Sequence, residues 1–172
     1  HRVEEDGVVK LLQLDGDFIL FKVKRTNEGL ALEFINSTPS PATKKYVANF
    51  VREWFDLETD LSPFYKLARK DELLKNLVKK HYGYRIIGQP DLFESLVWAV
   101  LGQQINVQFA YTLKQRFVEN FGEKLSWKSQ DYFLFPTPER VASLGDRDLL
   151  PLQFSRQKSK YTVNIAEAFA NA

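Results

Sequence analysis

The first 35 residues alternate short hydrophobic runs with turn residues, which is the pattern of antiparallel β-strands. Val8–Leu14, Phe18–Lys24 and Leu30–Ile35 are rich in Val, Ile, Leu and Phe, and such runs favour strands. They are separated by Asp15–Gly16–Asp17 and Asn27–Glu28–Gly29, whose residue types are typical of hairpin turns. The sequence therefore predicts a small antiparallel meander near the N-terminus.

From Lys44 onward the hydrophobic positions recur every three or four residues, which is the period of an amphipathic helix. The preceding segment 36–43, NSTPSPAT, holds two prolines and is predicted to be a boundary turn. Three helices are predicted before residue 90: Lys44–Phe55, a short helix capped by Asp60 or Ser62 and ending at Ala68, and a helix capped by Asp71. Residues 82–89 are predicted to form a loop.

The most hydrophobic helix of the chain is predicted to follow. Asp91 is a good N-cap, and Glu94 stands three residues later, as in a capping box. Residues 92–101 are apolar nearly all round, so the helix is predicted to be central and buried. Gly102 suits the left-handed residue with which many helices end.

An uncharged amide pair comes directly after that helix. Asn106 can cap a second helix, so Gln103, Gln104 and Ile105 are predicted to form a short turn between two buried helices. Amide side chains at such a turn can donate and accept hydrogen bonds without a charge to desolvate. A polar turn without any ligand is the alternative. The second helix has a predicted core stripe of Phe109, Ala110, Leu113, Phe117, Val118 and Phe121.

The last part of the chain is predicted to be a loose stretch, 122–136, then a helix capped by Thr137, a turn at 149–154 and a helix opened by Ser155. This final helix carries Arg156, Lys158 and Lys160 in its first turns. Cations at the positive end of a helix dipole cost some stability, which favours an anion facing them. A solvated helix face is the alternative.

Composition narrows the class of protein only slightly. The chain has 172 residues, 44% of them hydrophobic, and 14 are Phe, which is enough for one domain or two small ones. A net charge of +2 permits contact with a polyanion but does not by itself indicate it. There is no cysteine, which excludes disulfides and thiolate chemistry, and His1 and His81 cannot form a metal cluster. With no apolar run of membrane length and no signal peptide, a cytoplasmic protein is expected.

Several motifs, in order, resemble the helix-hairpin-helix DNA glycosylase superfamily, and in particular its DNA-3-methyladenine glycosylase II type. They are VREWFDLETDLSPFYKLARKD (51–71), FESLVWAVLGQQIN (93–106), FPTPERVASL (135–144) and LQFSRQKSKYTVNIAEA (152–168). The resemblance covers the chain from about Leu14 onward. It implies an α+β protein: a small antiparallel sheet domain followed by a mostly helical, incomplete glycosylase domain. The expected divisions are 1–57 for the sheet and its helix, 58–90 for connecting helices, and 91–172 for the first part of the helical domain.

The resemblance implies that duplex DNA containing damaged bases is the partner, with no membrane and no obligate protein partner. Such enzymes flip a damaged nucleotide out of the duplex and hydrolyse its N-glycosidic bond. In the family the turn after the first buried helix enters the minor groove, and the position that fills the vacated stack falls on Gln104. The best-known member of the family has leucine at that position, so Gln104 departs from the family pattern. The expected DNA-binding residues are Gln103, Gln104, Ile105, Asn106, Arg156 and Lys158.

The resemblance also implies chemistry that no residue of the chain is expected to supply. The family's Gly-rich hairpin turn and catalytic aspartate are expected beyond Ala172, and the segment alone is expected to be inactive. Asp131, Asp146 and Asp148 do not match the catalytic position and are expected to be loop or cap residues. No cofactor or metal is implied. The amide turn favours alkylated purines over oxidised guanine as the substrate. Two alternatives stay open: a non-catalytic DNA-binding module, and an α+β protein-interaction domain.

Overall fold

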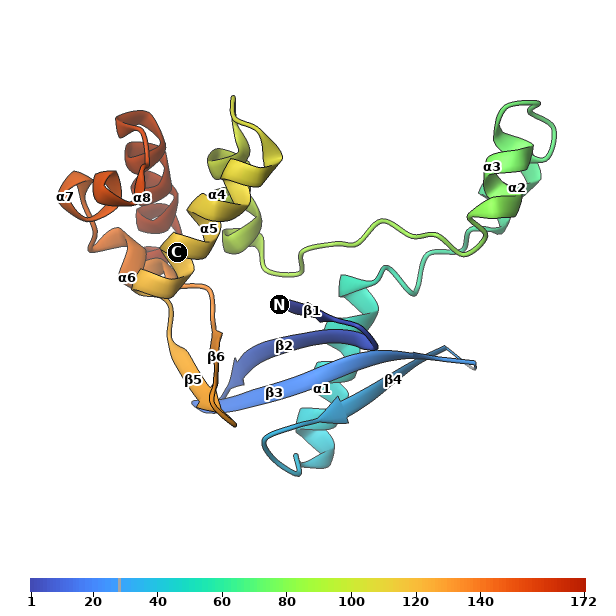
Figure 1. The fold of residues 1–172 in the computed structure, drawn as a ribbon, viewed down its shortest axis with the longest axis horizontal. Coiled ribbons are helices and arrows are strands. Elements are labelled where there is room, and N and C mark those ends of the chain that lie inside the picture. The colour runs from blue at the N-terminus through green and yellow to red at the C-terminus, as the bar shows by residue number, and fades with distance from the viewer. Residues whose placement is uncertain (28) are drawn as a thin grey trace. The chain divides into compact units, whose positions relative to one another are not determined.

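The computed structural model describes residues 1–27 and 29–172, so Glu28, in one predicted turn, lies outside the described residues. The chain forms two compact units (Figure 1). The first combines His1–Thr43 with Asp91–Ala172, and the second is Lys44–Pro90. The first unit contains the sheet together with the helices that flank the amide turn.

The predicted meander is confirmed as a four-stranded antiparallel sheet with the order β1-β2-β3-β4. Its strands are β1 (Arg2–Glu4), β2 (Gly7–Leu14), β3 (Asp17–Thr26) and β4 (Gly29–Phe34). Asp15 and Gly16 join β2 to β3 with φ angles of 52° and 86°, the left-handed pair that a two-residue hairpin turn needs. The sequence did not predict β1, because three residues are too few to show an alternating pattern.

A second hairpin occupies the stretch 122–136, which was wrongly predicted to be loose. β5 (Lys124–Trp127) pairs with β6 (Gln130–Phe133) across a turn in which Lys128 and Ser129 have φ angles of 46° and 62°. The signal was missed because neither turn residue is Gly, Asn or Asp. Figure 1 shows this hairpin running from the helices to the sheet. Its side chains Leu125, Trp127 and Tyr132 pack against the buried residues Val9, Leu11 and Leu20.

The helices of the first unit surround one hydrophobic core. They are α4 (Leu92–Gly102), α5 (Val107–Phe121), α6 (Pro138–Ala142), α7 (Asp146–Leu149) and α8 (Arg156–Ala170), with a 3-10 turn at Leu150–Leu152. The predicted stripe of α5 is confirmed, since Leu113 and Phe117 are fully buried. The prediction that α4 is buried all round is wrong, because Leu92 is 63% and Leu96 40% exposed. The predicted turn at 149–154 is mostly helical.

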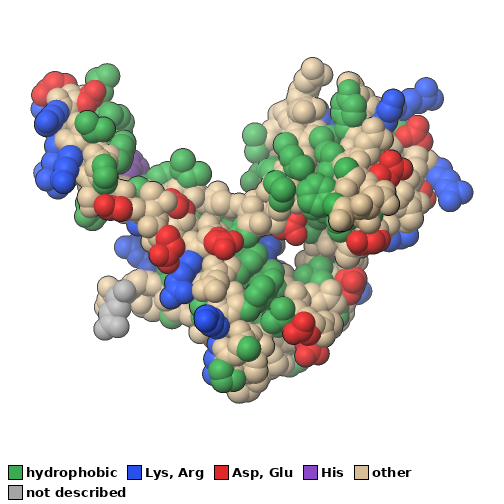
Figure 2. Space-filling model, turned by 180° about the vertical axis from the view of Figure 1, so that it is seen from behind, with side chains coloured by type: hydrophobic (Ala, Val, Ile, Leu, Met, Phe, Trp, Pro, Cys, Tyr) green, Lys and Arg blue, Asp and Glu red, His purple; other side chains and the backbone are tan. Residues whose placement is uncertain are grey.

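The second unit holds most of α1 and two short helices. α1 (Pro41–Trp54) starts earlier than predicted because Ser40 Oγ accepts the amide of Thr43, and proline is favoured in a first helical turn. α2 (Ser62–Ala68) and α3 (Leu74–Lys80) follow. Asp60 accepts the amide of Ser62, and Asp71 accepts the amides of Leu73 and Leu74. The N-cap positions themselves are Leu61 and Leu73, so the predicted caps are wrong by one and two residues. Figure 2 shows hydrophobic side chains on the surface of this unit, at upper left. Its exposed large hydrophobic residues are Phe64, Leu67, Leu73, Leu74, Leu77, Tyr82, Tyr84, Ile86 and Ile87. Within the described residues, none of the helices combines the length and apolar character of a membrane span.

Candidate functional site

The helix that leads into the amide turn is fixed at its start by a cap and an ion pair. Asp91 Oδ1 accepts the amide of Glu94 at 2.7 Å, as predicted. The Glu94 carboxylate points to α5 instead of completing a capping box, and it accepts from Lys114 Nζ at 2.6 Å. Burial alone would raise the pKa of Glu94, but the positive charges of Lys10 and Lys114 outweigh it and hold that pKa below its ordinary value. The pair therefore links α4 and α5 while both groups are charged.

The turn itself has a different backbone from the one predicted. Gly102 is the last residue of α4 and is not among the residues with positive φ. Gln103 is extended (φ −63°, ψ 131°), and Gln104 takes the left-handed conformation with φ 55°. The chain thus places a residue with a side chain where glycine would be preferred. Gln103 and Gln104 are both exposed at the tip of the turn.

Because Gly102 is helical, we expect a Gly102→Ala variant to be more stable than the wild type. A Cβ at this position would meet no atom within 4 Å. Alanine restricts the unfolded chain, so the unfolding free energy should rise by about 0.5 kcal/mol in urea denaturation. Gly16→Ala is the control with the opposite sign, since Gly16 has φ 86°. A loss of stability in Gly102→Ala would contradict the helical assignment.

The other side of the turn is anchored to the protein. Asn106 Oδ1 caps α5 by accepting the amide of Phe109 at 2.8 Å, so the predicted cap is confirmed. Ile105 is half-buried and packs against the core that contains Leu113 and Phe117. Of the four expected DNA-binding residues in this segment, Gln103 and Gln104 are therefore the two that project outward, while Ile105 and Asn106 hold the base of the turn.

The two expected cations of α8 lie in different environments. Arg156 is exposed at the first turn of the helix. Lys158 is partly buried, and its Nζ donates to the carbonyl oxygens of Val100, Leu101 and Gln103 at 2.7, 2.9 and 2.8 Å. The structure thus brings Lys158 to the amide turn, through contacts that the sequence pattern did not reveal.

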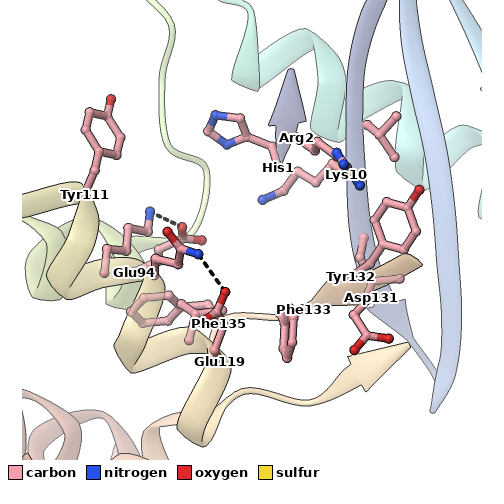
Figure 3. Close-up of a pocket in the computed structure, with 15 residues that line it drawn as sticks. His1, Arg2, Lys10, Glu94, Tyr111, Glu119, Asp131, Tyr132, Phe133 and Phe135 are labelled. Atoms are coloured by element: carbon pink, nitrogen blue, oxygen red, sulfur yellow. Dashed lines mark hydrogen bonds and ion pairs between the residues drawn. The ribbon is translucent and has the colours of Figure 1, made fainter. Parts of the chain in front are cut away.

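A cavity of about 360 Å³ lies beside α5, between β2, α4 and the β5–β6 hairpin. Glu94 and Lys114 are among its lining residues. Figure 3 shows Glu94 at this cavity, with Lys10, Tyr132 and Phe135 also among the side chains labelled. Lys114 Nζ lies 5.8 Å from the ring centroid of Phe135. This ring therefore already interacts with a cation of the protein.

The three aspartates expected to be loop or cap residues have structural partners. Asp131 accepts from Lys124 and Ser126 within the hairpin. Asp148 accepts the amide of Gly145, and Asp146 accepts from Ser159 Oγ at 2.6 Å. Among the described residues, no group of three or more His, Asp or Glu is arranged to hold a metal ion.

Comparison with protein families matches nearly the whole chain to DNA repair proteins. Residues 2–96 match the family described as 8-oxoguanine DNA glycosylase, N-terminal domain. Residues 97–171, which include the amide turn and α8, match the HhH-GPD superfamily of base excision DNA repair proteins.

Individual relatives and solved structures that resemble this chain are also DNA glycosylases. A DNA-3-methyladenine glycosylase of Bacillus subtilis is 41% identical, over 99% of this chain and 57% of its own length. The solved structure of a 3-methyladenine DNA glycosylase from Archaeoglobus fulgidus has a TM-score of 0.81 and 25% identity, over 95% of this chain and 56% of that one. The structure of a Clostridium acetobutylicum 8-oxoguanine glycosylase/lyase bound to DNA has a TM-score of 0.70 and 21% identity, over 98% of this chain and 64% of that one. The chain thus spans little more than half the length of the B. subtilis relative.

Proposed function

Because the chain belongs to the helix-hairpin-helix DNA glycosylase superfamily, we propose that the complete protein excises alkylated purines from duplex DNA. In this proposal the enzyme flips the damaged nucleotide and hydrolyses its N-glycosidic bond. The turn of Gln103 and Gln104 probes the minor groove. No residue of this chain is assigned the role of the catalytic acid or nucleophile.

One observation carries the role of the turn: the left-handed backbone of Gln104 at an exposed tip. This conformation costs a non-glycine residue about 1 kcal/mol or more. Strained residues that persist in a structure cluster at functional sites. Other non-glycine residues, such as Lys128 and Ser129, share this conformation in plain turns, so the argument for Gln104 also needs its exposed position between α4 and α5. We infer from the two together that its side chain contacts something outside the protein.

The chemistry of an amide suits the space left by a flipped nucleotide. Gln104 can occupy part of the vacated stack and exchange hydrogen bonds with the orphaned base opposite. The minor groove presents a degenerate pattern of acceptors and donors, so such a probe senses shape and pairing more than sequence. The exposed cation of Arg156 is proposed to contact a backbone phosphate.

The proposed substrate class follows from the relatives and from the leaving group. The B. subtilis relative, at 41% identity, is a 3-methyladenine glycosylase. A purine methylated on a ring nitrogen carries positive charge, which weakens its glycosidic bond and lowers the demand on the enzyme. Residues 2–96 match the N-terminal domain of 8-oxoguanine DNA glycosylases. The experiment must therefore also test DNA that contains oxidised guanine.

The decisive experiment separates the turn's stability from its function. In the complete protein, Gln104→Gly should raise the unfolding free energy by about 1 kcal/mol because it relieves the left-handed strain. The same variant should lower kcat/KM for release of 3-methyladenine from alkylated duplex by at least about tenfold, which corresponds to roughly 1.4 kcal/mol. A residue that served only the turn would show the stability gain without the loss of activity.

Gln130→Ala, a change at an exposed glutamine of β6, is the matched control and should leave release unchanged. Gln104→Gly with unaltered release would remove the probing role but keep the glycosylase. A different outcome is that the wild type releases no base from alkylated DNA but releases 8-oxoguanine from duplex. That result would assign the protein to the 8-oxoguanine branch of the superfamily. Binding without any release would favour a non-catalytic DNA-binding module.

A further inference from the structure

The ammonium group of Lys158 closes the end of a helix other than its own. Its Nζ donates to the carbonyl oxygens of Val100, Leu101 and Gln103, all within 2.9 Å. A lysine has three N–H donors, so these bonds account for its full donor capacity. Lys158 therefore has no hydrogen left with which to bind a phosphate while this geometry holds.

These hydrogen bonds explain why a cation, Lys158, is placed near the positive end of the α8 dipole. The last carbonyls of a helix have no partner within the helix and carry partial negative charge. A glycine in the left-handed conformation after the helix commonly allows backbone amides to satisfy them. In α4 that glycine is absent from the left-handed position, and Lys158 satisfies these carbonyls instead. For Lys158, the negative partner in the structure is thus the C-terminus of α4, and no external anion is needed to explain its position.

Lys158 is itself held in place by rigid neighbours. Its own amide is capped by Ser155 Oγ at 3.2 Å, which fixes the first turn of α8. The next residue, Ser159, is 1% exposed and donates to Asp146 Oδ1 at 2.6 Å, which ties α8 to α7. The lysine thus connects a braced helix to the turn.

We propose that Lys158 is a positioning residue that fixes the direction in which Gln103 and Gln104 leave α4. It acts by binding the Gln103 carbonyl, one peptide before the left-handed residue. Ile105 and Asn106 fix the other side, so the exposed pair is held at both ends. The proposal rests on the proposed function in one respect: the held amides are taken to probe DNA.

The first measurement needs no DNA. In the complete protein we expect wild-type backbone order parameters of about 0.85 for the amides of Gln103 and Gln104, as in rigid backbone. In Lys158→Met, which keeps the side-chain length but has no donor, they should fall below about 0.6. Lys158→Arg retains donors and charge and should restore much of the order. Unchanged order parameters in Lys158→Met would overturn the proposal, whatever the protein's function.

The second measurement uses undamaged duplex DNA at several salt concentrations. A lost phosphate contact lowers the slope of log K against log salt by about 0.9. Lys158→Met should leave that slope unchanged, whereas Arg156→Met, at an exposed cation on the same helix, should lower it. A slope reduced by one phosphate in Lys158→Met would make the lysine a DNA ligand and overturn the proposal.

The third measurement links position to activity. Release of 3-methyladenine by Lys158→Met should fall at least tenfold in kcat, with affinity for undamaged DNA retained, and Lys158→Arg should recover most of it. A merely structural role would lower the melting temperature without this selective loss at temperatures where the variant is folded. Retained kcat in a variant with a disordered turn would refute the positioning role. A wild type without glycosylase activity would refute the proposed function. The order parameters of the first measurement would then still test whether Lys158 positions the turn.

Discussion

A Phe117→Ala variant should lose about 3–5 kcal/mol of unfolding free energy, the largest loss expected for any single change considered. Phe117 is fully buried at the centre of the core of the first unit. Its ring lies 5.7 Å from that of Phe121 and 5.6 Å from those of Phe135 and Phe154, measured between centroids. These rings come from α5 and from two separate segments beyond it, so the cavity cannot close by a shift of one element.

Urea denaturation followed by circular dichroism measures this loss. Phe64→Ala is the matched control, because Phe64 is 47% exposed and its truncation removes less buried surface than that of the fully buried Phe117. We expect that control to change the unfolding free energy by less than about 1 kcal/mol. Equal effects of the two substitutions would mean that the aromatic cluster does not form the core.

A Glu94→Ala variant should lose about 2–3 kcal/mol, because it leaves Lys114 without its carboxylate. The side chains of Glu94 and Lys114 are only 11% and 22% exposed, so water replaces the lost partner poorly. Burial lowers the pKa of Lys10, and the negative charge of Glu94 partly offsets that effect. Glu119→Ala, at an exposed carboxylate of α5, is the control and should cost much less.

The same pair predicts how stability depends on pH. The pKa of Glu94 is lower in the folded than in the unfolded protein, so its contribution is complete above the unfolded pKa of about 4.3. It is lost as the pH falls through the lower, folded pKa. The difference in unfolding free energy between wild type and Glu94→Gln should therefore shrink below about pH 4. A difference that is constant from pH 7 to pH 3 would contradict the ion pair.

Local signals in the sequence predicted the frame of the site well. Asp91 and Asn106 are caps because short polar side chains compete for free helical amides, and that preference is read from neighbouring residues alone. The order of helix, amide pair and helix was therefore predictable. The choice of left-handed residue was not, because the structure keeps Gly102 inside α4 and gives the left-handed conformation to Gln104.

That contact shows what single-sequence reasoning lacks. Lys158 and Gln103 are 55 residues apart, and no periodicity connects them. The sequence pattern predicted an anion facing the cations at this helix start, but the fold shows that Lys158 meets backbone carbonyls at the end of α4. The β5–β6 hairpin was missed for a related reason, since its turn lacks the usual residues and its packing against Leu11 and Leu20 is not visible in the local sequence.

The contact between that hairpin and the sheet also sets an order of events during synthesis. Gln13 of the sheet binds Glu123, 110 residues further along the chain. At translation rates of 5–20 residues per second, the ribosome needs roughly 6 to 24 seconds to supply the hairpin after β2 has been made. During that interval the apolar surface around Val9 and Leu11 lacks its hairpin cover. Newly made chains are then open to chaperones and to one another, and variants that slow the hairpin should aggregate during expression even where the finished protein is stable.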